Sequence, residues 1–340
     1  MSDLPITYAG IDYLDRTRPL VDGSVQPKGV SLRYITVDPG ELFRRVAQGT
    51  EFEVAEMSTS TYMNQISRGD DRYVAIPVFP SRNFRHGYIY IRGDSDIREP
   101  KDLIGSRVGV PEYQMTAAVW QRAALEHDYG VKPQDITWFQ GGESDPVYVE
   151  RNAIPNPPGV SIEIIPDGKT LQGMLDAGEL DALFTPNRPP SLLDGSGRLR
   201  RLFENWVEVE QDYFRRTGFF PIMHLIVIRR DIYEANPWLP VSLLDAFTEA
   251  KRLGWDRLIR TGTLAIMAPW LPRELEEMTQ VLGPDYWPYG FRDNHKIVDA
   301  MCQYHFEQGL SERRLTPEDL FVPETHNAPV GKKRYARYAS

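Results

Sequence analysis

Residues 73–92 read YVAIPVFPSRNFRHGYIYIR, and this stretch decides how the fold is interpreted. Apolar residues at 74–79 predict one β-strand, and residues 88–92 predict a second. Pro77 and Pro80 fix φ and lack an amide hydrogen, so the chain is expected to leave the sheet between the two strands. The residues of the break are then expected to lie at a strand end, where open α/β sheets bind ligands.

The break between these strands is basic. Arg82, Arg85 and His86 fall within five consecutive positions and follow Ser81. A guanidinium group matches a carboxylate with two parallel hydrogen bonds. A solvated turn with ordinary surface charges is the alternative, but three basic residues between two apolar strands favour a site for a small anion.

Strands and helices alternate on both sides of this stretch. Towards the N-terminus, strands are expected at 6–9, 31–37 and 52–55. Asp38 followed by Pro39 and Glu41 is typical of a helix start, and the hydroxyl residues 58–60 are natural caps for a second helix. This order predicts a mostly parallel sheet.

The same alternation returns after residue 94, followed by a helical C-terminal region. Strands are expected at 107–110, 136–139, 162–165, 181–184 and 219–228, and helices at 117–130, 170–178, 240–253, 272–282 and 294–308. The pattern predicts an α/β protein of two lobes, 1–93 plus 222–340 and 94–221. In such a fold, a ligand is expected in the cleft between the lobes.

Composition narrows the functional class. The formal net charge of −9 over 340 residues argues against a nucleic-acid or anionic-membrane partner. Cys302 is the only cysteine, which excludes an internal disulfide and fits a reducing cytoplasm. No apolar run is long enough to cross a bilayer, and the N-terminal residues lack the pattern of a secretory signal, so a cytoplasmic protein is expected. The basic residues 331–340 are expected to form a loosely held end, with an arm gripping a partner subunit as the alternative.

Long stretches of the chain resemble the 4,5-dihydroxyphthalate decarboxylase family, which is related to type II periplasmic solute-binding proteins. The matching stretches include FEVAEMSTSTY (52–62), AIPVFPSRNFRHGYIYI (75–91), VGVPEYQMTAAVWQR (108–122) and TGFFPIMHLIVIRRDIYEANPW (217–238). The resemblance runs nearly end to end. It implies a type II solute-binding-protein fold and the loss of CO2 from a hydroxylated aromatic dicarboxylate, with 4,5-dihydroxyphthalate giving 3,4-dihydroxybenzoate.

Such a reaction needs cations for two carboxylates but no redox cofactor, and we expect no cofactor. Arg82 and Arg85 are the first candidates for binding the carboxylates. Arg16 and Arg18, on the loop after the first strand, are the next candidates. Tyr113, Gln114 and Thr116 stand where a helix begins, so that free backbone N–H groups there would favour a carboxylate. A plain helix cap is the alternative for Thr116.

Proton transfer needs a base near the ring hydroxyls and an acid near the ring carbon. His86 and His224 are the best candidates because imidazole titrates near neutrality. Positive neighbours would lower the pKa of His86, whereas His224 lies in an apolar run where a hydrogen-bonded core histidine is the alternative. Glu56 is expected to orient a histidine or accept a hydroxyl proton, with pairing to an arginine as the alternative.

Two serines complete the expected substrate contacts. Ser81 adjoins the arginines, and Ser58 is expected either to bind substrate or to cap the next helix. The other histidines are expected to be structural or superficial: His127, His295, His305 and His326.

Several other chemistries lack their sequence signatures. There is no metal-binding histidine motif, no GxGxxG after a strand, no P-loop and no GxSxG, so we predict no metal, nucleotide or acyl-serine chemistry. A metal site made of His86, His224 and Glu56 would be recognisable only in three dimensions. The leading hypothesis is a cytoplasmic, homo-oligomeric decarboxylase of a hydroxylated aromatic acid. The alternatives are a non-catalytic solute-binding protein for a small carboxylate and a decarboxylase of another hydroxylated or heteroaromatic acid.

Overall fold

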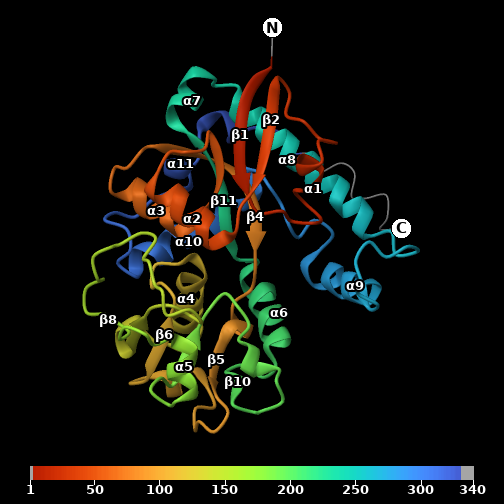
Figure 1. The fold of residues 1–340 in the computed structure, drawn as a ribbon. Coiled ribbons are helices and arrows are strands. Elements are labelled where there is room, and N and C mark those ends of the chain that lie inside the picture. Colours follow the sequence, from red (N-terminus) through yellow and green to blue (C-terminus); the bar gives the residue numbers. More distant parts are fainter. Residues whose placement is uncertain (1–2, 331–340) are drawn as a thin grey trace. The chain divides into compact units, whose positions relative to one another are not determined.

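The structure is a computed structural model that describes residues 3–330 (Figure 1). The chain divides into two compact α/β units. Unit 1 contains residues 3–82, 222–299 and 315–330, and unit 2 contains residues 83–221 and 300–314. The expected lobes share the boundary at 221/222 but differ from this division in residues 83–93 and 300–314. Within residues 3–330, no helix is both long and apolar enough to cross a membrane.

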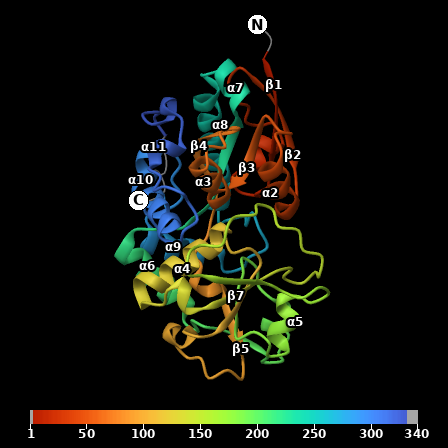
Figure 2. The ribbon, with the colours of Figure 1, turned by 90° about the vertical axis from the view of Figure 1, so that its left-hand side faces the viewer.

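Unit 1 is built on a five-stranded sheet in the order β2-β1-β3-β11-β4. Its strands are β1 (Leu4–Gly10), β2 (Val30–Thr36), β3 (Val54–Ser58), β4 (Tyr73–Arg82) and β11 (Ile222–Arg229). β1 pairs in parallel with both β2 and β3, whereas β11 runs antiparallel between β3 and β4. β1 and β2 lie side by side at one edge of the sheet in both views (Figures 1 and 2).

The helices of unit 1 surround this sheet. They are α1 (Arg18–Val21), α2 (Pro39–Gln48), α3 (Thr59–Ser67), α7 (Arg230–Ala235), α8 (Leu239–Leu258), α9 (Leu271–Leu282), α10 (Phe291–Glu307) and α11 (Pro317–Leu320), with a 3₁₀ turn η5 (Pro323–Thr325). α2 starts as expected, since the Asp38 side chain accepts a hydrogen bond from the Gly40 amide. α2 and α3 contact β3, while α8 contacts β4 and α1. The division between the units falls inside α10.

β4 does not end at its prolines, so the expectation that the chain leaves the sheet there is wrong. The strand continues to Arg82 and forms the edge of the sheet. Its pairing with β11 shifts register between His224 and Ile226, opposite the segment that holds Pro77 and Pro80. Prolines are tolerated at edge strands and irregularities because no regular ladder needs their missing amide. The shift places Ser81 opposite His224.

α8 also differs from the expectation, which ended it before Gly254. The helix continues to Leu258. A Cβ atom at Gly254 would lie 1.0 Å from the Asp15 carbonyl oxygen, so only glycine lets α8 pass this close to the loop that follows β1. Gly254 is therefore a packing glycine and not a helix stop.

Unit 2 is built on a six-stranded sheet in the order β10-β5-β9-β6-β7-β8. Its strands are β5 (Ile89–Arg92), β6 (Arg107–Val110), β7 (Thr137–Gln140), β8 (Ser161–Ile164), β9 (Ala182–Phe184) and β10 (Leu199–Arg201). β8, β7, β6 and β9 are parallel, whereas β5 pairs antiparallel with both β9 and β10. β5 thus belongs to this sheet and not to the sheet of β4.

The helices of unit 2 are α4 (Thr116–Tyr129), α5 (Leu171–Asp176) and α6 (Trp206–Thr217), with 3₁₀ turns η1 (His86–Tyr88), η2 (Pro100–Leu103), η3 (Pro133–Asp135) and η4 (Pro190–Leu192). α4 ends at Gly130 in the left-handed conformation, and Thr170 caps α5 through the Gly173 amide, both as expected. α6 is an addition, because no helix was expected between residues 178 and 219. Leu171, Leu175 and Leu183 form part of an apolar cluster that fixes α5 on the sheet.

Candidate functional site

Two neighbouring strands of unit 1 place a glutamate and a histidine on the same face of the sheet. Glu56 lies on β3 opposite Ile226 of β11, and His224 lies two residues before Ile226. Since side chains two residues apart share a face of a strand, Glu56 and His224 are diagonal neighbours within reach of each other. The antiparallel insertion of β11 beside β3 is thus what creates the pair.

The Glu56 carboxylate is fully buried and is held by three donors. Oε1 lies 2.7 Å from Nδ1 of His224 and accepts a hydrogen bond from the Tyr13 hydroxyl at 2.6 Å. Oε2 accepts a hydrogen bond from the Ile11 amide at 3.2 Å. Burial, and then the neighbouring Glu56 charge, raises the pKa of Tyr13, so its hydroxyl remains a donor at neutral pH. Glu56 therefore orients a histidine, as expected, and does not pair with an arginine.

These contacts fix the chemistry of the imidazole. Because Nδ1 faces the carboxylate, it donates its hydrogen to Glu56 and leaves Nε2 as the nitrogen that exchanges a proton. Among residues 3–330, no hydrogen-bond partner of Nε2 is found, and the His224 side chain is 17% exposed. The ring of Phe43 packs edge-on against the imidazole at 4.5 Å. A carboxylate behind a partly exposed imidazole is the arrangement of a general acid or base.

An arginine adjoins this pair through Tyr13. The Arg16 guanidinium lies between the rings of Tyr13 and Trp287, 3.9 Å and 4.5 Å from their centroids. Its Nε donates to the Pro80 carbonyl, and Nη1 lies 2.6 Å from an Asp15 carboxylate oxygen. Within the described part of the chain, Nη2 has no hydrogen bond. Arg16 is therefore a rigidly held cation beside the glutamate and histidine.

Two serines flank His224 from both neighbouring strands. Ser58 is its register partner on β3, and Ser81 is its register partner on β4. Ser58 occupies the N-cap position of α3, as the capping alternative expected, but its side chain makes no capping hydrogen bond. Unit 1 thus brings together five of the expected site residues: Arg16, Glu56, Ser58, Ser81 and His224. Arg18 lies outside this group, since it is half-exposed and pairs with Asp12 at 2.7 Å.

Arg82 is buried and is used to hold the fold. Its Nη2 donates to the Pro288 carbonyl at 2.9 Å and to the side-chain oxygen of Asn294. Burial lowers its pKa to about 9. These contacts tie β4 to the start of α10 and give Arg82 a structural role. Binding of a carboxylate by Arg82 stays a prediction.

His86 is enclosed in unit 2, where aromatic rings pack against it. Its ring stands 5.5 Å from that of Phe203 and 5.1 Å from that of Tyr213, and neither ring nitrogen has a hydrogen-bond partner within residues 3–330. Its pKa is lowered to about 4, as expected in direction, but burial and not the charge of Arg82 or Arg85 is the main cause. The geometry therefore favours His224 as the group that transfers a proton.

Arg85 and the start of α4 contribute the other expected residues of unit 2. Arg85 is buried, lies 3.5 Å from the Pro186 carbonyl, and has a pKa lowered to about 10 by burial. The Tyr113 amide donates to Gln140, and the Gln114 side chain donates to Glu112. Thr116 is the first residue of α4 and not its cap, which is Met115, so the capping alternative for Thr116 is wrong.

The remaining histidines are hydrogen-bonded at structural or surface positions, as expected. Their partners are Glu307 for His127, Glu318 for His295, Ser311 for His305 and the Phe321 carbonyl for His326. Across residues 3–330, no three histidine, cysteine or carboxylate side chains lie close enough to hold a metal ion.

Tyr13 is the site residue that sequence reasoning missed. It stands in the polar loop after β1, three residues before Arg16, and carries no motif. The only available signal was the presence of an aromatic residue in a loop already expected to supply an arginine. Its role depends on contact with Glu56, 43 residues away.

Comparison with known proteins assigns the family. No family model matches the chain. The 4,5-dihydroxyphthalate decarboxylase of Comamonas testosteroni is 40% identical over 323 residues, which cover 95% of this chain and 98% of the relative. The chain belongs to the 4,5-dihydroxyphthalate decarboxylase family. A second member, the 4,5-dihydroxyphthalate decarboxylase of Pseudomonas putida, is 40% identical over 219 residues, or 64% of this chain and 84% of that protein.

Solved structures confirm the fold expected for the family. The periplasmic aliphatic sulphonate-binding protein SsuA from Escherichia coli is similar with a TM-score of 0.56 and 13% identity, over 96% of this chain and 99% of that one. The desulfurization enzyme DszB is similar with a TM-score of 0.51 and 16% identity, over 94% of this chain and 97% of that one. The decarboxylase family member described here therefore has a periplasmic-binding-protein-like α/β fold.

Proposed function

We propose that the protein is a carboxy-lyase that converts 4,5-dihydroxyphthalate into 3,4-dihydroxybenzoate and CO2. Two relatives that carry this activity in their names match the chain at 40% identity, one of them over nearly its whole length. The structural observation that carries the proposal is the contact of 2.7 Å between Glu56 and Nδ1 of His224. A protein that only binds a carboxylate has no need of a histidine that is oriented through Nδ1 by a buried carboxylate.

The reaction exchanges a carboxylate for a proton on the aromatic ring. The hydroxyl para to the departing carboxylate feeds electron density into the ring, and the ring carbon that bears the carboxylate accepts a proton. The bond between this carbon and the carboxylate then breaks, and its electron pair restores the aromatic ring as CO2 leaves. One proton is consumed for each CO2 released, and no electron donor or acceptor is required.

His224 supplies this proton from Nε2 in the proposed mechanism. The Glu56 carboxylate stabilises the imidazolium before transfer and keeps Nδ1 protonated afterwards. Tyr13 and the Ile11 amide hold the carboxylate in place, because each donates to one of its oxygens. General acid catalysis by a positioned side chain typically accelerates a reaction by about 10²–10⁴-fold.

Binding of the substrate is assigned to the cation and hydroxyls beside His224. Arg16 is proposed to bind one carboxylate, because aromatic stacking and two hydrogen bonds fix its plane. Ser58 and Ser81 are proposed to hydrogen-bond the ring hydroxyls. In unit 2, Arg85 and the first turn of α4, with Tyr113, Gln114 and Thr116, stay proposed substrate contacts.

A direct assay separates this function from its alternatives. The purified protein, treated with a chelator, is incubated anaerobically with 4,5-dihydroxyphthalate while CO2 and 3,4-dihydroxybenzoate are measured. Equal amounts of both products would support the proposal and its independence of added metal. Tight binding without CO2 would identify a solute-binding protein. Release of CO2 only from another hydroxylated or heteroaromatic acid would keep the chemistry and change the substrate.

We also propose a cytoplasmic location and a homo-oligomeric state. Cys302 is the only cysteine of the chain, so no disulfide can form within it, which suits a reducing compartment. Fractionation of producing cells, with the protein followed by antibody, tests the location. Recovery from the periplasmic fraction would contradict it.

A further inference from the structure

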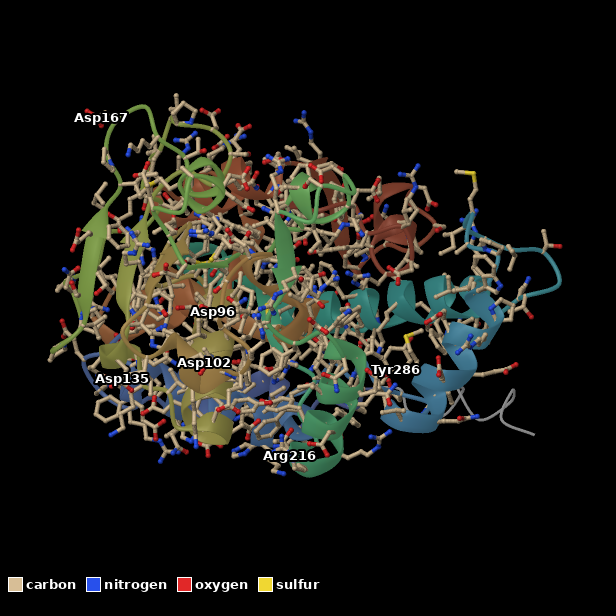
Figure 3. All side chains as sticks on the ribbon, turned by 90° about the horizontal axis from the view of Figure 1, so that it is seen from below. Asp96, Asp102, Asp135, Asp167, Arg216 and Tyr286 are labelled. Carbon is tan, nitrogen blue, oxygen red and sulfur yellow. The ribbon has the colours of Figure 1, made fainter. Side chains whose placement is uncertain are left out.

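The segment that joins α8 to α9 exposes an unusual concentration of apolar side chains. Leu264 and Ile266 are 40% and 38% exposed, Trp270 is 73% exposed, and Met267 is fully exposed. Single exposed apolar residues are ordinary, but four large ones within seven positions mark an interaction surface. In Figure 3 the loop that follows α8 projects outward beyond α8 and α9. We call residues 261–270 the apolar loop.

The loop after β1 enlarges the same surface. Leu14 is 70% exposed. It lines a surface pocket together with Leu258, Ala265 and Ile266, and the charged part of the lining comes from Asp15, Arg18 and Arg257. The apolar surface therefore continues from the apolar loop to the loop that also carries Tyr13 and Arg16.

The two sides of the apolar loop carry opposite charges. Arg257 and Arg260 are exposed at the end of α8. In the first turns of α9, Glu274, Glu276 and Glu277 are exposed together with Arg273, which pairs with Glu277 at 3.9 Å, so this side carries a net negative charge. A two-fold axis through the apolar loop would bring the acidic side of one copy against the basic side of another. Such self-complementarity is the property that an isologous interface requires.

We propose that the apolar loop, with Leu14 and the adjoining ends of α8 and α9, is an interface between two copies of this chain. Tryptophan, methionine and arginine are the residue types enriched at interface cores. A second copy fits the surface because its charges complement themselves, whereas a partner of one charge sign would meet repulsion on one side. This inference names the contact behind the proposed oligomer and does not depend on the enzymatic activity.

The interface also supports the loop that bears the site. α8 passes so close to this loop that Gly254 leaves no room for a Cβ atom beside the Asp15 carbonyl. Asp15 in turn pairs with Arg16 at 2.6 Å, and Arg16 stacks on Tyr13. If the proposed function holds, association would fix α8 against this loop and raise the fraction of molecules with an ordered site.

The test compares the molar mass of the intact protein and of variants across a concentration series. Trp270 is the cap of α9, where aspartate is a favoured residue, so Met267→Asp with Trp270→Asp should fold normally while charging the surface. Val147→Asp, which changes a 76% exposed valine in unit 2, is the matched control. Sedimentation equilibrium is the measurement, and circular dichroism checks the fold.

At micromolar concentration, the unaltered protein and the Val147 variant are expected to have the molar mass of an assembly of two or more chains of 39.0 kDa each. The double variant is expected to associate at least about 100-fold more weakly, the effect of losing two anchor residues. Arg260→Glu should weaken association, and adding Glu276→Arg should restore part of it. The proposal would be overturned if the unaltered protein is still monomeric at 50 times this micromolar concentration. It would also be overturned if the double variant keeps the molar mass of the unaltered protein.

Discussion

Replacing Glu56 by glutamine removes one charge from the site and keeps its shape. Glutamine has nearly the same size and still offers an oxygen to Nδ1 of His224 and to the Tyr13 hydroxyl. It cannot offer a second acceptor to the Ile11 amide, which now donates to Oε2. An unsatisfied buried amide costs about 1–3 kcal/mol of stability, so the variant should fold but melt at a lower temperature.

The effect on catalysis follows from the lost attraction between carboxylate and imidazolium. Two unit charges about 4 Å apart attract by about 4 kcal/mol at an effective dielectric constant of about 20. Solvent screens this pair weakly, since Glu56 is 0% exposed and the His224 side chain is 17% exposed. A factor of ten in rate corresponds to about 1.4 kcal/mol, so kcat should fall by about 10²–10³-fold. KM should change little, because Glu56 does not contact the substrate in the proposed mechanism.

Steady-state formation of 3,4-dihydroxybenzoate gives both constants. Glu53→Gln is the control, because Glu53 accepts a hydrogen bond from the Thr7 amide at 2.9 Å on the same sheet but lies away from His224. The control should keep kcat within about threefold of the unaltered protein. A folded Glu56 variant that also keeps kcat within this range would refute the role of the glutamate and histidine pair.

Three other substitutions test the interpretation of buried groups. His86→Phe should keep turnover. Because the pKa of His86 is lowered to about 4, the unaltered protein should lose stability as pH falls from about 6.5 to 4, and the variant should lose less. A large loss of kcat would return the proton-transfer role to His86. Burial raises the pKa of Glu210 to about 7. The protonated side chain therefore favours the folded state at low pH, and the free energy of unfolding should fall by about 3 kcal/mol as pH rises from about 4.5 to 7. Unfolding of Glu210→Gln in urea should lack this decline, and an unchanged pH profile would contradict the assignment. Gly254→Ala should destabilise unit 1 by several kcal/mol because its Cβ would overlap the Asp15 carbonyl, whereas Gly262→Ala, which meets nothing within 4 Å, should be neutral; equal melting temperatures would refute the packing role.

Local signals predicted the elements whose ends are set by neighbouring residues. Asp38 with Pro39 marked the start of α2, Gly130 the end of α4 and Thr170 the start of α5. Each of these acts through backbone groups within one helical turn, which a sequence displays directly. The alternation of strands and helices then sufficed for the α/β class.

Contacts between distant segments set the features that the sequence did not predict. β4 continues through Pro77 and Pro80 because its register with β11 is irregular there, and β11 lies some 140 residues later in the chain. α8 continues through Gly254 because that glycine meets Asp15. A proline or a glycine has the same local preferences in each case, so only the partner segment decides between a break and a close contact.

The functional site, too, could be predicted only in part from the sequence. Glu56 and His224 were separate candidates, 168 residues apart, and nothing in either segment indicates that β11 inserts beside β3. His86 adjoins arginines in the sequence, yet the η1 turn buries it between the aromatic rings of Phe203 and Tyr213. Residue type identified the groups that can do the chemistry, and the pairing of strands selected among them.

A single-turnover experiment with His224→Gln tests the central claim most directly. In D2O, 4,5-dihydroxyphthalate is mixed with an excess of the unaltered protein or of the variant, and CO2 release and deuterium in the product are followed. The unaltered protein is expected to release one CO2 per substrate and to place solvent deuterium on the vacated ring carbon. The variant should bind the substrate but release CO2 at least about 100-fold more slowly. Release at the unaltered rate by the variant would contradict the assignment of His224 as the proton donor.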